Sequence, residues 1–147
     1  MTWYLVVKFV HVFVAILAVG SSAGSSLWLR LAMAKPAHLP FALRSAKLLD
    51  ERLTRPGLMV LLITGLWMAA TRWSLTLFWV RAALLLIVVV LVVLFAVAGP
   101  LWSQLIRVTE DGNPTSSRRL EVWFEVVGAA SGLILIVIIW LMVIKPS

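Results

Sequence analysis

Apolar residues form four long runs along the chain, and short segments rich in polar and charged residues separate these runs. Each run, or the helix that contains it, is long enough to cross a bilayer, which takes about 20 helical residues. The predicted spans are 3–31, 41–71, 75–106 and 117–145. We therefore predict an all-α fold, a polytopic four-helix membrane bundle that forms one integral membrane domain over residues 1–147.

The second span is the least regular, because its apolar part, 57–70, is too short to cross a bilayer alone. We expect this helix to begin near Pro40, since proline suits a first helical turn. A kink is expected at Pro56, near the membrane surface, where the helix loses a hydrogen-bond donor. In the third span Ser74 is a candidate cap, and Gly99-Pro100 should bend the helix.

Charged residues inside the second helix have partners at helical spacing. Lys47 can meet Asp50 and Glu51, and Glu51 can meet Arg55. No acidic residue is expected near the membrane midplane, so the spans offer little for a coupled transport site.

Near the start of the fourth span, Glu121 and Glu125 lie one helical turn apart. Paired carboxylates can carry out acid–base chemistry. The structural alternative is that they form ion pairs, with Arg118 pairing with Glu121 and Glu125 meeting Arg30 across the bundle.

Composition narrows the function classes further. The chain is 63% hydrophobic with a mean hydropathy of +1.07, which indicates an integral membrane protein in contact with the lipid bilayer. It contains no cysteine, which excludes disulfides, thiolate metal sites and iron–sulfur clusters. The net charge of +7 does not indicate a nucleic-acid partner, because the basic residues cluster between apolar spans.

The distribution of basic residues predicts the orientation. Nine of the 13 Lys and Arg residues lie in or beside the two loops that join spans one and two and spans three and four, when the polar helical extension before Pro56 is counted with the first loop. Only Lys8, Arg72, Arg81 and Lys145 lie on the other side. By the positive-inside rule both basic loops are cytoplasmic and both termini are outside (N-out/C-out). The expected location is the bacterial cytoplasmic (inner) membrane.

His11 is the one histidine within an apolar run, and such a residue marks a functional site by default. It follows Trp3 by eight residues, which corresponds to a depth of about 12 Å at 1.5 Å per residue. Lys8 lies one turn earlier on the same face, and Arg81, seven residues after Ser74, is expected at a similar depth. A cationic pocket with an imidazole suits an anionic ligand such as haem, which offers iron and two propionates.

Structural roles are also open for these residues. Lys8 and Arg81 can act as anchors whose charged groups reach the lipid headgroups. His11 can form a hydrogen bond to a neighbouring helix instead of binding a ligand.

A second axial ligand is harder to assign. His38 lies in a polar loop, far from His11 along the chain, and is expected to be solvated. The remaining candidates are Met68, Met142, a water molecule or a residue from another copy of the chain.

Two segments of small residues, 20–24 and 128–132, carry glycines four residues apart. This spacing lets helices approach closely. Spans one and four are therefore expected to pack there, or one segment forms the seam of a homo-oligomer.

Several short motifs resemble a known family in order and spacing over nearly the whole chain. They are Lys8-Phe9-Val10-His11, the segments 49–53 and 56–67, Glu125, and the pair Lys145-Pro146 that follows the last span. The chain resembles the four-helix bacterial membrane proteins that include HemJ-type protoporphyrinogen oxidases and CopD-like proteins. It is most similar to an uncharacterised branch, a domain of unknown function, in which proline-glycine precedes the second helix.

The resemblance implies that His11 is an axial ligand of a b-type haem. It also implies cofactor-binding roles for Lys8, Arg81 and Trp73, since Arg81 occupies the place of a lysine that the HemJ type needs in its third helix. Arginine stays charged and cannot exchange protons as lysine can, although it can pair with a propionate. The departure weakens the case for protoporphyrinogen oxidation more than the case for haem binding.

Three hypotheses follow. The first is a haem b protein, redox-active as a possible oxidoreductase, that exchanges electrons with a quinone, a porphyrinogen or a membrane partner. The second is a non-catalytic membrane anchor or assembly subunit of a larger complex. The third is CopD-like copper handling, against which stand the two distant histidines and the absence of cysteine and of a methionine cluster in the sequence.

Overall fold

A computed structural model describes residues 2–111 and 114–145, and over these residues the chain forms helices and turns with no strand. The helices are α1 (Thr2–Met33), α2 (Leu39–Leu49), α3 (Arg55–Arg72), α4 (Phe78–Val92), α5 (Gly99–Glu110) and α6 (Pro114–Ile144). Shorter elements are a 3₁₀ turn (Pro36–His38) and two π-helical segments (Asp50–Thr54 and Val93–Ala98). The π segments join α2 to α3 and α4 to α5 without a break.

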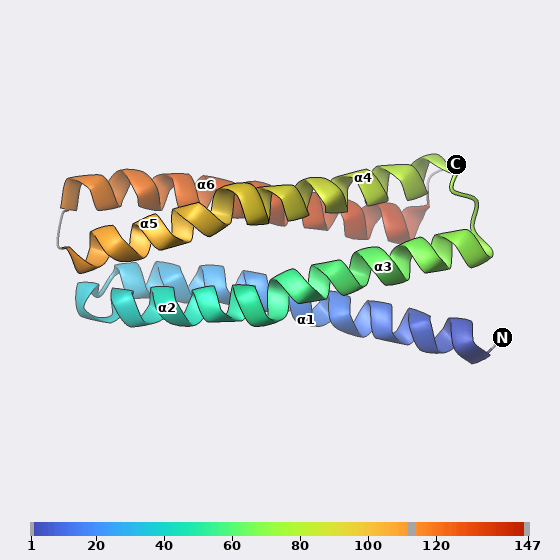
Figure 1. Cartoon of the computed structure of the whole chain (residues 1–147), viewed down its shortest axis with the longest axis horizontal. Coiled ribbons are helices and arrows are strands. Elements are labelled where there is room, and N and C mark those ends of the chain that lie inside the picture. Colours follow the sequence, from blue (N-terminus) through green and yellow to red (C-terminus); the bar gives the residue numbers. More distant parts are fainter. Residues whose placement is uncertain (1, 112–113, 146–147) are drawn as a thin grey trace.

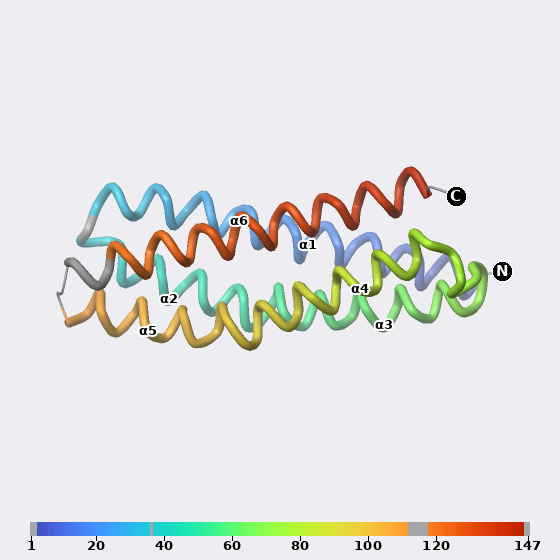
Figure 2. The backbone as a smooth tube through the Cα atoms, turned by 90° about the horizontal axis from the view of Figure 1, so that it is seen from above, coloured from blue at the N-terminus to red at the C-terminus, as the bar shows by residue number. Residues whose placement is uncertain are grey.

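Four helices are long and apolar enough to cross a membrane, which confirms the predicted all-α fold with four spans. They run over Trp3–Met33, Leu39–Arg72, Phe78–Glu110 and Arg118–Ile144. In Figure 1, α1 lies beside α2 and α3 in one layer, and α4 and α5 lie beside α6 in the other. Figures 1 and 2 place both termini at the same end of the bundle, and we call this the terminal end. The turns after α1 and α5 lie at the other end, called the turn end.

Each π-helical segment ends shortly before a proline. Asp50–Thr54 precedes Pro56, and Val93–Ala98 precedes Pro100. Proline has no N–H and its ring crowds the preceding turn. The backbone hydrogen bonds there join residues five apart, as in a π-helix, and not four apart. Pro56 lies in the middle of the Leu39–Arg72 helix, and the expected position of this kink near the membrane surface stays a prediction.

Close packing between α1 and α3 fixes the site described below. A Cβ placed on Gly57 would lie 3.0 Å from Cβ of Ala18, which is 1% exposed, so glycine is needed where these helices cross. Leu58, beside this crossing, is fully buried in the central apolar cluster. Large apolar side chains such as Phe9 and Ile16 point outward, as expected where lipid surrounds a bundle.

The small-residue segments do not pack as expected. No other described atom lies within 4 Å of a Cβ placed on Gly20, Gly24, Gly128 or Gly132. The prediction that spans one and four pack closely through these glycines is therefore wrong, because the space next to each glycine is open and Gly128 lines a cavity between α1 and α6. A role as a seam between copies of the chain stays a prediction.

A candidate ligand cavity around His11

His11 is buried on α1 and directs one ring nitrogen at α3. Its Nδ1 atom lies 2.7 Å from Oγ1 of Thr64, and the residue is 8% exposed. The Thr64 hydroxyl donates its single proton to the carbonyl of Val60 at 2.6 Å. Since that proton is used, Oγ1 accepts from Nδ1–H, and Nε2 carries the free lone pair of the neutral imidazole.

The residue after Thr64 makes room for the ring. A Cβ placed on Gly65 would lie 3.3 Å from Cε1 of His11, closer than most side chains tolerate. The sequence pair Thr64-Gly65 therefore supplies both an acceptor for the imidazole and the space that the imidazole fills.

The imidazole lines a cavity of about 350 Å³ near the terminal end of the bundle. Such a volume falls within the range of about 300–1,000 Å³ found for small-molecule and cofactor pockets. Most of the wall is apolar and comes from α3, α4 and α6. The apolar lining includes Leu61, Leu62, Ala69, Val80, Ala83, Leu84, Ile87 and Val143.

Two lysines lie at the exposed edge of the cavity. Lys8 comes from α1, one turn before His11, and Lys145 follows the end of α6. The Lys145 ammonium sits 4.4 Å from the centroid of the Trp73 ring, a cation–π contact that fixes its position. The Trp73 ring in turn packs edge-on against Trp79 at 5.3 Å. Of the four residues proposed from sequence, the structure thus brings Lys8, His11 and Trp73 together.

Arg81 does not line this cavity, and its expected convergence with His11 is wrong. The expected depth of Arg81 requires Ser74 to cap the helix, but α4 begins at Phe78 with Leu77 as its N-cap residue. Ser74 instead holds a turn, in which it accepts hydrogen bonds from Thr76 and Leu77. Arg81 therefore belongs to the first turn of α4, where it is exposed outside the stripe formed by Val80, Ala83 and Ile87.

Sequence reasoning missed Lys145 and Thr64 as members of the site. Lys145 was visible as a basic residue at the end of the last span, but only the tertiary fold brings it to Trp73. Thr64 has no distinguishing sequence context, because threonines in membrane helices commonly bond to their own backbone, as Thr71 does.

The cavity also holds the two methionines considered as second ligands, Met68 and Met142. His38 is exposed in the 3₁₀ turn at the turn end and does not line the cavity. Among the described residues, no group of three or more His, Cys, Asp and Glu side chains could hold a metal ion.

Ion pairs elsewhere agree only in part with the sequence. The predicted Arg30–Glu125 and Lys47–Glu51 pairs are present, each at 3.8 Å. Arg55, however, pairs with Asp50 at 2.7 Å and not with Glu51. The π-helical segment widens the turn, so residues five apart share a face and the expected four-residue spacing does not hold.

The family model described as "Predicted integral membrane protein (DUF2269)" matches residues 5–146. No curated protein and no solved structure matches the chain significantly.

Proposed function

The chain belongs to the DUF2269 family of predicted integral membrane proteins, and we propose that it binds haem b through His11 and acts in redox chemistry. The observation that carries the proposal is the arrangement of His11. A buried imidazole whose Nδ1–H is held by Thr64 presents Nε2 as a neutral ligand atom, which is the arrangement that metal-binding histidines need.

The charge around the cavity supports an anionic cofactor. Lys8 and Lys145 lie at its exposed edge, and none of the described residues that line it is an Asp or Glu. Two ammonium groups match the two propionates of haem, while the apolar wall matches the face of the macrocycle. In this proposal the lysines hold the carboxylates and His11 holds the iron.

When bound, haem b would supply one-electron chemistry. The residues of the chain would hold and shield the group: His11 would bind the iron, Trp73 would position Lys145, and the walls of α3 and α4 would exclude water. Met68 and Met142 line the same cavity and could supply a further ligand to the iron.

The partner in electron exchange is proposed to be a quinone or a porphyrinogen. HemJ-like oxidation of protoporphyrinogen is the narrower form, in which a lysine that can exchange protons is expected near the cofactor. Arg81 stands in the sequence position of that lysine and lies outside the cavity, but Lys8 and Lys145 each bring an amine to it.

The proposed location is the bacterial inner membrane with the terminal end outside. The basic residues that lie toward the turn end support this orientation by the positive-inside rule. The cavity would then open in the outer half of the membrane.

Two other functions have a supporting observation each. Copper handling is supported by one histidine and two methionines in the same cavity, because thioether and imidazole ligands suit Cu(I). A non-catalytic anchor or assembly subunit, or a homo-oligomer, is supported by the unpacked glycines of α1 and α6.

The test is the visible spectrum, oxidised and reduced, of protein expressed with ample haem and purified in mild detergent. We expect a Soret band with sharp reduced bands that is lost in His11→Ala and kept in His38→Ala, the matched control. A colourless protein that co-purifies with copper would favour copper handling. Absence of both cofactors would contradict the redox proposal and favour the subunit role.

A further inference from the structure

A second polar site lies in the middle of the bundle, apart from the His11 cavity. It is a cavity of about 60 Å³, here called the serine cavity, and it shares no lining residue with the cavity around His11. Its polar wall consists of Ser22, Ser25, Ser26, Asp50, Thr54 and Ser131. The inference below therefore does not depend on the function proposed for His11.

Asp50 is a largely buried carboxyl side chain within the long apolar helix Leu39–Arg72. It lies 11 residues after Leu39 and 22 before Arg72 in the helix Leu39–Arg72, and its side chain is 12% exposed. It pairs with Arg55, whose Nη2 atom is buried and has no hydrogen-bond partner among the described residues. The expectation of no acidic residue near the midplane stays a prediction, but a buried ion pair within a helix long enough to span the membrane points to function.

The hydroxyl groups around Asp50 are incompletely satisfied by the chain. Ser131 is 8% exposed, yet its hydroxyl and that of Ser25 form no hydrogen bond to any described residue. A buried polar atom without a hydrogen bond, such as Nη2 of Arg55, costs free energy unless water solvates it, and the hydroxyl groups that line the cavity can hold that water. The cavity is lined by these polar groups on one part of its wall and by apolar side chains on the rest, and its volume of about 60 Å³ exceeds the roughly 10–15 Å³ that one water molecule needs.

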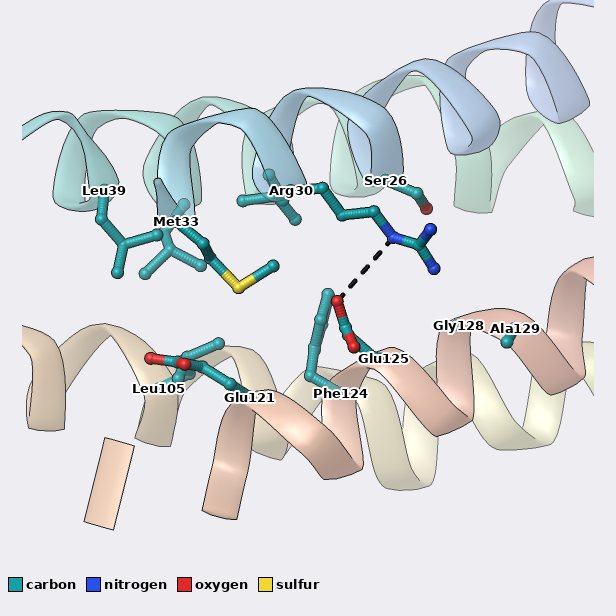
Figure 3. Close-up of a pocket in the computed structure, with 12 residues that line it drawn as sticks. Ser26, Arg30, Met33, Leu39, Leu105, Glu121, Phe124, Glu125, Gly128 and Ala129 are labelled. Carbon is teal, nitrogen blue, oxygen red and sulfur yellow. Dashed lines mark ion pairs between the residues drawn. The ribbon is translucent and has the colours of Figure 1, made fainter. Parts of the chain in front are cut away.

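A route to the surface adjoins the serine cavity. A second cavity of about 110 Å³, here called the vestibule, lies between α1 and α6 toward the turn end. Figure 3 shows Arg30 and Glu125 facing each other across it, with Met33 and Leu39 toward the turn. The two cavities have residues in common, among them Ser26 and Gly128, so they meet between α1 and α6.

We propose that the vestibule and the serine cavity form a water-filled inlet that carries water and protons from the turn end to Asp50. The charged pair Arg30–Glu125 keeps the outer part polar, and the serines continue this lining to the ion pair. The inlet ends there, since the apolar cluster around Leu58 fills the bundle between it and the His11 cavity.

The natural chain has no cysteine, so single cysteines can report on water in the inlet. The test compares Ser25→Cys and Ser131→Cys with Ala23→Cys, which is exposed on α1 and lines neither cavity. Each variant, in membrane vesicles, is treated with silver ion and the remaining thiols are counted after denaturation. The thiol loses a proton as the S–Ag bond forms, so reaction needs water that accepts the proton.

We expect the two inlet cysteines to react about tenfold faster than Ala23→Cys or more, because thiols ionise poorly in lipid. Reaction of both as slow as that of Ala23→Cys would overturn the proposal. Silver should also reach them from the turn end only, and equal reaction from both membrane faces would contradict an inlet that ends at Asp50.

A larger side chain at the junction of the two cavities gives an independent check. Nothing lies within 4 Å of a Cβ on Gly128, so Gly128→Leu can fill the junction of the two cavities without a backbone clash. This substitution should slow silver labelling of Ser131→Cys about tenfold while leaving Met33→Cys, in the vestibule, unchanged. Unchanged labelling of Ser131→Cys would show that water does not enter through the vestibule.

Discussion

His11 on α1 and Thr64 on α3 are joined by a hydrogen bond of 2.7 Å between Nδ1 and Oγ1. The Thr64 hydroxyl donates its hydrogen bond to the carbonyl of Val60, so the backbone of α3 sets the direction of the bond between Thr64 and His11. This relationship connects packing to chemistry, because the contact that joins two spans also determines which imidazole nitrogen can bind a ligand.

Thr64→Val tests this bond, since valine keeps the shape of threonine and removes the hydroxyl. We expect about 10–100-fold weaker haem binding, the usual effect of losing the partner of a ligating histidine. The measurement is a haem titration followed at the Soret band. Thr71→Val is the matched control, because Thr71 forms the same kind of bond to its own helix and does not line the cavity. Equal losses in both variants would rule out a specific role for Thr64.

Gly65→Ala should disturb the ligand site without harming the helix. Its Cβ would press on Cε1 of His11 from 3.3 Å, so the imidazole must shift by a few tenths of an ångström. We expect a shifted Soret band or reduced haem content, while helix propensity improves by about 1 kcal/mol. Gly20→Ala, where nothing lies within 4 Å, should leave the spectrum as in the natural protein. An unchanged spectrum in Gly65→Ala would show that His11 does not contact the cofactor.

Much of the fold follows from residues that act locally. The long apolar runs predict four spans. A helix that crosses a bilayer forms all its backbone hydrogen bonds internally and needs about 20 apolar residues. Pro56 and Pro100 mark the irregular turns, since each removes a donor from the ladder. The four-residue spacing rule for ion pairs fails where the helix is distorted. In the π-helical segment Arg55 therefore pairs with Asp50, five residues earlier, and not with Glu51.

The candidate site was predicted only in part, because its membership depends on where helices begin and how they pack. His11, Lys8 and Trp73 meet as expected. Arg81 does not join them, because residues 74–77 form a non-helical turn and α4 begins only at Phe78. Lys145 replaces it through a contact with Trp73 between segments far apart in the chain.

Lys145→Gln should weaken haem binding, because it removes one of the two positive charges at the cavity edge and the contact with Trp73. A charged hydrogen bond contributes about 1.5–3 kcal/mol, so the expected loss in affinity is roughly tenfold or more. Arg81→Gln, which removes a charge outside the cavity, should bind haem like the natural protein. Titrations of both variants at equal ionic strength provide the comparison, and a larger loss in Arg81→Gln would overturn the assignment of Lys145.

The Asp50–Arg55 pair should be the most sensitive charged contact in the described chain to loss of one partner. Its side chains are 12% and 13% exposed, and Arg55 also stacks over the Phe95 ring at 5.1 Å. Asp50→Asn leaves the guanidinium buried without a counter-ion, and breaking such a pair costs about 3–5 kcal/mol. Unfolding in mixed micelles of increasing denaturing detergent measures the loss in free energy of unfolding.

Two comparisons separate the charge from the packing. Glu110→Gln removes one partner of the exposed Arg44–Glu110 pair, 67% and 38% exposed, and should cost at most about 1 kcal/mol. The double variant Asp50→Asn with Arg55→Met removes both charges and keeps a long side chain, so it should recover part of the stability lost in Asp50→Asn. A double variant less stable than the single one would mean that Arg55 acts mainly through its contact with Phe95, and the pair would then not be the source of the sensitivity.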